Sequence, residues 1–123
     1  MKTSLRLIAA TSLLAAASLA CAQQAPAMAK DGALVGPNEM TLYTFDKDTA
    51  GKSACNGPCA KNWPPLVAKA DDKPAGEWTL ITRDDGAKQW AYKGKPLYFW
   101  VKDTKPGDRT GDGVNQVWHT AKP

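Results

Sequence analysis

Short stretches in which apolar and polar residues alternate, separated by turn-forming residues, make up most of the chain after residue 31. This period is that of half-buried strands, and the predicted strand-forming segments are 33–46, 77–83, 88–103 and 116–121. Within them, the chain is expected to reverse at Gly36-Pro37-Asn38 and at Lys93-Gly94-Lys95. No segment keeps a helical apolar period, so at most one short helical turn is expected, near the cysteine loop 55–59. The pattern predicts a mainly β fold, a small antiparallel β-sheet domain of sandwich-like or barrel-like form.

The predicted domain contains an internal repeat. The phrase "LYTFDKDT" at 42–49 recurs as "LYFWVKDT" at 97–104, with five of eight positions identical. A shift of 55 residues without gaps also aligns a tryptophan that follows each phrase. The aligned positions are Tyr43 and Tyr98, Phe45 and Trp100, Asp48 and Asp103, and Trp63 and Trp118. We expect one closed domain at 32–123, made of two tandem repeats at about 32–68 and 87–123 and related by an approximate two-fold axis.

The repeated phrase is interpreted first as scaffold. Alternation places Tyr43 and Phe45 on one face of a strand, and the same holds for Tyr98 and Trp100, so the pairs could stack across a core. The aspartate that follows each pair is expected to accept hydrogen bonds from the next turn. The second strand is apolar on both faces and is predicted to be central, with the first nearer an edge.

The motif Y-x-[FWY]-x-x-D, present twice, carries a resemblance to a known family. Together with "CNGPCAKNWPPL" after the first copy and a Val-Trp pair after the second, it covers nearly all of the chain beyond the N-terminal segment. The sequence resembles a bacterial family of exported proteins and predicted lipoproteins named for this motif, also called the secreted repeat of unknown function. The resemblance implies export and a duplicated repeat, and it implies no catalytic residues.

The N-terminal segment has the layout of a secretory signal peptide. Lys2 and Arg6 precede a run of small and apolar residues at 7–20 that is too short for a stable membrane anchor. A signal peptide at 1–22, cleaved after Ala20-Cys21-Ala22, and a flexible leader at 23–31 are predicted. In the alternative, Cys21 is the lipid-attachment residue of a lipoprotein, although Ser18 stands where leucine is usual. Membrane contact is expected only if Cys21 is lipidated.

Cleavage would leave two cysteines, Cys55 and Cys59, in an exported chain. They most simply form a structural disulfide, because redox exchange motifs usually have two intervening residues and this loop has three. The alternative is a metal site. Cys55, Cys59 and the single histidine, His119, are soft or borderline ligands that suit copper, and the repeat alignment sets His119 opposite Pro64. If the two cysteines form a structural disulfide, no cofactor is predicted. Copper is the expected cofactor only if they form a metal site.

The net charge and the sequence motifs give no support for nucleic-acid binding or for catalysis. Removing Lys2 and Arg6 lowers the formal net charge from +4 to about +2, and basic residues are not clustered, so nucleic-acid binding is not predicted. No nucleophile–base pair or phosphate-cradling motif indicates an enzyme. The prediction is a non-enzymatic binding or interaction module, secreted or in the periplasm or envelope, with a small ligand or an envelope protein as partner.

Two other functions stay open. One is a copper-binding redox or electron-transfer accessory. The other is a carbohydrate-binding module that uses exposed residues among the five tryptophans, in an aromatic cleft with two carboxylates. In every case, chemistry is expected where the two repeats differ, in the cysteine loop or in "GDRTGDG" with His119.

Overall fold

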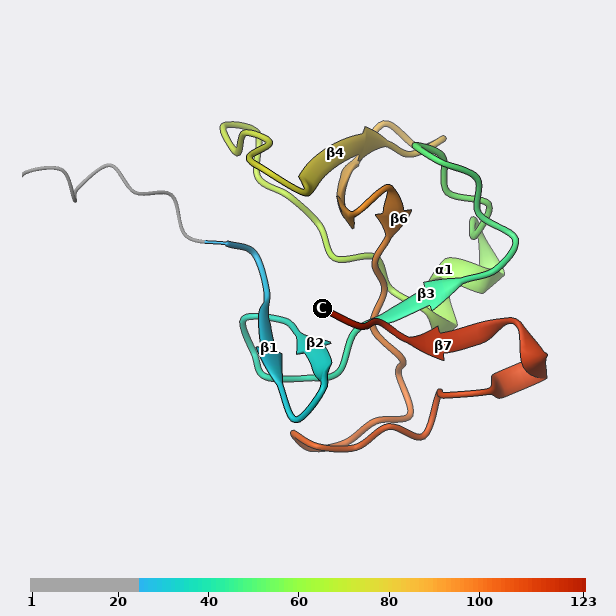
Figure 1. Ribbon diagram of the computed structural model, residues 1–123. Coiled ribbons are helices and arrows are strands. Elements are labelled where there is room, and N and C mark those ends of the chain that lie inside the picture. Colours follow the sequence, from blue (N-terminus) through green and yellow to red (C-terminus); the bar gives the residue numbers. More distant parts are fainter. Residues whose placement is uncertain (1–24) are drawn as a thin grey trace, which may run out of the picture.

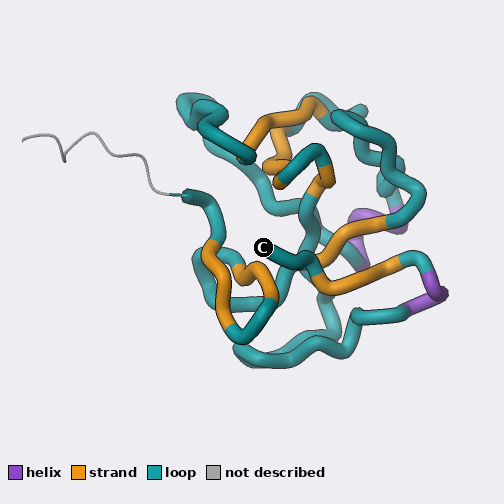
Figure 2. The backbone as a smooth tube through the Cα atoms, viewed as in Figure 1, coloured by secondary structure: helices purple, strands orange, loops and turns teal. Residues whose placement is uncertain are grey.

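The computed structural model describes residues 25–123. The predicted signal peptide and Cys21 lie outside the described residues. The elements in chain order are β1 (Met28–Lys30), β2 (Ala33–Val35), β3 (Tyr43–Phe45), α1 (Pro58–Asn62), β4 (Trp78–Thr82), β5 (Lys88–Tyr92), β6 (Lys95–Pro96), the 3₁₀ turn η2 (Val114–Gln116) and β7 (Trp118–Thr120). Figure 1 shows α1 and the strands, and Figure 2 shows how much of the backbone between them is loop.

The strands form three small antiparallel sheets, so the predicted mainly β, antiparallel fold is confirmed. β1 pairs with β2, β3 with β7, and β5 lies between β4 and β6. α1, the one α-helix among residues 25–123, begins at Pro58 within the cysteine loop and ends before Pro64-Pro65, as expected from the proline ring.

Two tight turns set the hairpins. The β1–β2 turn is Asp31-Gly32 and the β5–β6 turn is Lys93-Gly94, and both residues of each turn have positive φ. Such two-residue turns match the twist of antiparallel strands. The first hairpin corrects one prediction: Met28–Lys30 is a strand paired with β2, although 23–31 was expected to be a flexible leader. The sequence "DG" at 31–32 supplies the turn that makes this pairing possible.

The two repeats meet at a pair of tyrosines. The Tyr43 N–H donates to the Tyr98 carbonyl at 2.8 Å, and the Tyr98 N–H donates to the Tyr43 carbonyl at 3.0 Å. Tyr43 also pairs with Thr120, and Tyr98 with Pro65, which is the equivalent of Thr120 after a shift of 55. Each tyrosine segment therefore has a neighbour on both sides. The prediction of a central second strand is wrong, because 97–101 forms no strand and only Tyr98 makes isolated bridges, while β3 belongs to a two-stranded sheet with β7.

The side chains of the repeated motif cross from one repeat to the other. The Tyr43 hydroxyl donates to Asp103 Oδ2 at 2.6 Å, and the Tyr98 hydroxyl donates to Asp48 Oδ2 at 2.6 Å. Both tyrosines are fully buried. The second oxygen of each aspartate accepts from the following loop, at the N–H groups of Ala54 and Thr110 respectively. Each aspartate thus fastens its own loop and the tyrosine of the other repeat. We call these two contacts the crossed Tyr–Asp bonds.

The aromatic rings interleave in the same crossed manner. Phe45 stacks on Trp118 with centroids 4.1 Å apart, Trp118 on Trp63 at 3.7 Å, and Trp63 on Trp100 at 3.9 Å. Each motif aromatic therefore packs on the tryptophan of the other repeat. Trp63 and Trp118 are buried, and Phe45 and Trp100 at the two ends of this four-ring stack are half-buried. Gly111 lies against it, because a Cβ there would approach Trp63 to 2.8 Å.

The crossed bonds predict an unusual alkaline titration. Burial, and then the hydrogen bond to an aspartate, raise the pKa of Tyr43 and of Tyr98 well above the ordinary value of about 10. A raised pKa means that the fold stabilises the neutral phenol, so this stabilisation is complete below about pH 10 and is lost as the pH rises through the folded-state pKa. We expect two of the three tyrosines to ionise only with unfolding, when tyrosinate absorbance and circular dichroism are followed together. Ionisation of all three before the fold is lost would contradict the assignment.

Candidate functional site

The two repeats differ in the side chains at one pair of equivalent positions near the crossed Tyr–Asp bonds. The backbone of Asp46 donates to Val117 O at 2.8 Å, and that of its counterpart Val101 donates to Asn62 O at 3.0 Å. The side chains at these equivalent positions share no chemistry. Asp46, just after β3, and His119 in β7 form a hydrogen-bonded pair, with Oδ2 2.8 Å from Nε2, whereas the equivalent positions after the shift of 55 are Val101 in the second copy and Pro64 in the first. The polar pair belongs to one side of the molecule only.

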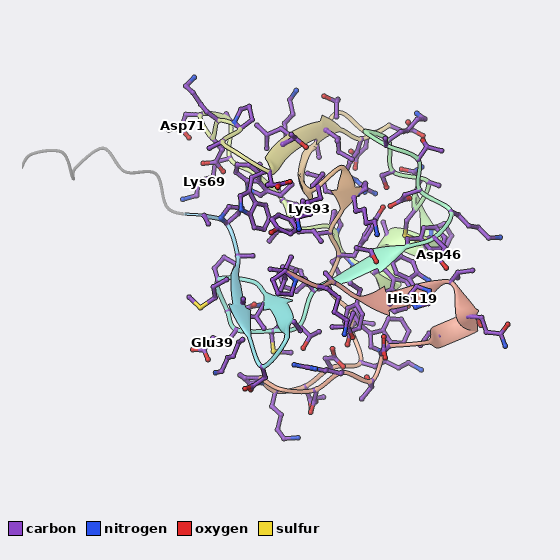
Figure 3. All side chains as sticks on the ribbon, viewed as in Figure 1. Glu39, Asp46, Lys69, Asp71, Lys93 and His119 are labelled. Atoms are coloured by element: carbon purple, nitrogen blue, oxygen red, sulfur yellow. A yellow bond between two sulfur atoms is a disulfide. The ribbon has the colours of Figure 1, made fainter. Side chains whose placement is uncertain are left out.

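Strand alternation sets which face this pair occupies. Tyr43 and Phe45 of β3 turn to the core, so Thr44 and Asp46 turn to the other face. Thr44 is the direct cross-strand partner of His119 in β7. Asp46 and His119 are each about half exposed, at 54% and 47% of the side chain. Figure 3 shows the two side by side at the surface.

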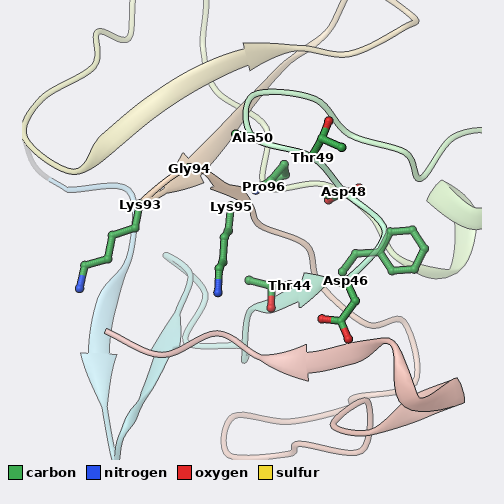
Figure 4. A pocket seen from close by; sticks show the side chains of 10 residues that line it. Thr44, Asp46, Asp48, Thr49, Ala50, Lys93, Gly94, Lys95 and Pro96 are labelled. Carbon is green, nitrogen blue, oxygen red and sulfur yellow. The ribbon is translucent and has the colours of Figure 1, made fainter.

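The β5–β6 turn supplies two lysines to the same face. Lys93 and Lys95 flank Gly94, and both side chains are exposed. In Figure 4 they extend in the same direction from the turn, toward the level of Thr44 and Asp46. Lys93 has a φ of 53°, a left-handed conformation in which Asn, Asp and Gly are the usual residues of this turn type. Lys93 therefore adopts this conformation at some energetic cost.

Two adjoining hollows, of about 330 Å³ and about 300 Å³, lie between this turn and the β3–β7 pair. Both are lined by Thr44, Asp46, Lys93 and Lys95, and we call them together the lysine hollow. One part extends to Asp48 and Thr49, and the other to His119 and Lys122. The lysine hollow is open to solvent and takes residues from both repeats, including the β5–β6 turn that precedes the second copy of the phrase.

The carboxylates at the lysine hollow are already engaged. Asp48 accepts from Ala54 and Tyr98, and burial raises its pKa despite these bonds. Asp46 is held by His119. Asp112 accepts a hydrogen bond from the N–H of Thr120, which also lines the hollow. This bond, with smaller contributions from His119 and Lys122, lowers the pKa of Asp112 below its ordinary range. By contrast, no carboxylate among residues 25–123 lies within ion-pair distance of Lys93, Lys95 or Lys122. The side chains free to bind are therefore cationic.

The cysteine loop provides a different environment. Cys55 and Cys59 form a disulfide, which confirms the prediction from their export and spacing. Cys59 borders a separate, shallow hollow beside Trp63 and Trp118, and His119 is not among its lining residues. Within 25–123, no group of three or more His, Cys, Asp or Glu side chains is placed to hold a metal ion. His119 instead lies in the pair with Asp46.

The predicted motif residues and the lysine hollow have different roles in the molecule. The eight motif side chains take part in the crossed Tyr–Asp bonds or in the aromatic stack. His119 was noticed from the sequence as a possible ligand, but Asp46, Lys93 and Lys95 were not. The replacement of Asp46 by Val101 within the repeated phrase, and a lysine at a turn position suited to asparagine, are the signals that point to them.

Comparison with known families decides the relationship. The model of a family described as a secreted repeat of unknown function matches residues 26–67 and 79–122, one match for each repeat. The chain belongs to this family. No curated protein and no solved structure matches this chain.

The two family matches coincide with the two halves of the structure. They correspond to the halves that exchange tyrosine–aspartate bonds and stacked rings. The description of the family as secreted supports export. Among the described residues, no helix has the length and apolar character needed to cross a membrane.

Proposed function

We propose that this secreted-repeat protein is a non-enzymatic ligand-binding module of the periplasm or cell envelope, and that its ligand binds in the lysine hollow. The observation that carries the proposal is the asymmetry between the copies. Positions common to both repeats are occupied in holding the halves together, while the Asp46–His119 pair interrupts the repeat and borders a hollow with unpaired lysines. A surface that departs from the internal symmetry next to a rigid scaffold is well suited to specific recognition.

A binding role is favoured over catalysis by the contacts of His119. Its ring is hydrogen-bonded to Asp46, and within the described residues it has no hydrogen bond to a serine, threonine or cysteine. A histidine oriented by a carboxylate needs a nucleophile or a substrate proton within reach to act as a general base. The pair is more simply a fixed polar wall of the lysine hollow.

The test is a titration that does not require the ligand to be known. Isotope-labelled protein is mixed with the small-molecule fraction of a periplasmic extract, and amide chemical shifts are followed. Binding in the lysine hollow shifts the amides of Thr44, Lys95 and Thr120, and Asp46→Val, which gives position 46 the residue found at 101, changes the size of these shifts. Shifts confined to the cysteine loop, or no shifts at all, would refute the proposal.

The burial of the tryptophans disfavours the carbohydrate-binding alternative. Trp78 and Trp100 are half-buried, while Trp63, Trp90 and Trp118 are buried. Few indole faces are therefore available to a sugar ring, and the Trp100 face already lies under Lys102 at 5.9 Å. The copper alternative stays a hypothesis, with elemental analysis of the purified protein as its test.

A further inference from the structure

We infer that the lysine hollow is a site for a phosphate-type oxyanion, presented either by a small molecule or by a lipid headgroup. The inference rests on the proposed function and adds the chemical class of the ligand. It comes from the balance of charges around the two adjoining hollows and from the conformation of the turn that carries two of the lysines.

The charge balance favours an anion. Three ammonium groups, those of Lys93, Lys95 and Lys122, border the lysine hollow without a carboxylate within ion-pair distance among the described residues. The two carboxylates that line it have partners, Asp46 in His119 and Asp48 in Ala54 and Tyr98. Counted as formal charges, the three ammonium groups outnumber the two lining carboxylates, so an incoming oxyanion would meet a net positive surface. Ammonium–oxyanion hydrogen bonds are among the stronger ones available at a protein surface.

The donors come from three directions. Lys93 and Lys95 extend from the β5–β6 turn (Figure 4), Lys122 follows β7, and Thr44 belongs to β3. A tetrahedral oxyanion has several acceptor atoms and can use donors spread in this way, whereas a single planar carboxylate presents only two oxygens. The volume of about 300 Å³ in each part leaves room for the group that carries the oxyanion.

The turn conformation points to the same residues. At the φ of 53° found for Lys93, asparagine is the better residue for the turn conformation. The amine of Lys93 lies 5.2 Å from the centroid of Tyr92, a contact worth little at an exposed site. The lysine hollow gives a role to a charged side chain at a position that favours asparagine.

This conformation gives a test that separates binding from folding. The variant Lys93→Asn with Lys95→Gln removes two charges and leaves the hairpin with its preferred turn residue. The matched control, Lys61→Gln with Lys69→Asn, removes the same charge from α1 and from a separate hollow. Calorimetric titration with inorganic phosphate at low, constant ionic strength should give a dissociation constant at least about tenfold weaker for the first variant and nearly unchanged for the control. The midpoint temperature of thermal unfolding should not be lower for the first variant than for the parent protein.

A second arm distinguishes the sources of the oxyanion. Vesicles of phosphatidylcholine, with and without phosphatidylglycerol, are sedimented with the protein and with the same two variants. Retention that needs phosphatidylglycerol and is lost only in the Lys93–Lys95 variant assigns the site to a lipid headgroup, while phosphate binding without retention assigns it to a small molecule.

Two results would overturn the inference. One is no binding in either arm, and the other is equal loss in both variants, which would show only a general effect of charge. If the amide shifts described above still map to the lysine hollow in that case, the proposed function stands and only the ligand class is wrong.

Discussion

Replacing Trp118 by alanine is expected to lower the free energy of unfolding by about 3–5 kcal/mol, the cost of removing a large ring from a well-packed core. Its indole contacts Phe45 and Trp63 face to face and the ring of Tyr98 edge to face, so the cavity would open where the two repeats meet. Domains of this size have about 5–15 kcal/mol of stability in total, so the variant would be at best marginally folded. Urea unfolding followed by circular dichroism measures the loss.

The matched control for Trp118→Ala is Trp78→Ala. Trp78 is half-buried and packs with Trp90 and Tyr92, outside the four-ring stack. Its loss should be clearly smaller, because less area is buried and the site opens to solvent. The internal symmetry predicts that Trp63→Ala resembles Trp118→Ala. A loss below about 1 kcal/mol for Trp118→Ala would mean that the stack is not the joint between the repeats.

The second large effect concerns the crossed Tyr–Asp bonds. Replacing Asp103 by alanine is expected to cost about 3 kcal/mol, because the buried Tyr43 hydroxyl loses its acceptor and the Thr110 N–H and hydroxyl lose theirs. Tyr43→Phe should cost less, because the carboxylate keeps the two bonds from Thr110. A double-mutant cycle of Tyr43→Phe with Asp103→Ala, measured by urea unfolding, should give a coupling energy of about 1–2 kcal/mol.

The sharpest control uses the other aspartate. Tyr43 and Asp48 belong to the same copy of the motif, but the hydroxyl of Tyr43 bonds Asp103 and that of Tyr98 bonds Asp48. A cycle of Tyr43→Phe with Asp48→Ala should therefore be additive within about 0.5 kcal/mol. Strong coupling within one copy, with none between copies, would show that the bonds are not exchanged.

Several features of the scaffold could be predicted from the sequence because they depend on short-range patterns. The alternation of β4, the turn at 84–86, the single helical turn before Pro64-Pro65 and the disulfide all follow from neighbours in the chain. The hairpin at 28–35 was missed at its first strand, because the three exposed residues of β1 have no alternation of their own and are ordered by pairing with β2.

The lysine hollow was harder to predict, since its residues come from separate parts of the sequence. Asp46 and His119 are 73 positions apart and meet only because β3 pairs with β7. Lys93 and Lys95 precede the second copy of the phrase, so the alignment of the repeats gave no reason to connect them with Asp46. Their shared surface depends on how the β5–β6 turn folds over the β3–β7 pair.

The residue pattern is enough to identify a duplicated β-rich chain of a secreted-repeat family, with a motif whose tyrosines, aromatics and aspartates are predicted to belong to the scaffold. How that motif joins the two repeats depends on the three-dimensional arrangement. Hydrogen-bond partners are chosen by distance in space, and the two-fold arrangement sets each tyrosine beside the aspartate of the other copy. The same arrangement separates the residues that hold the halves together from Asp46, His119 and the lysines, which lie at the surface around the lysine hollow.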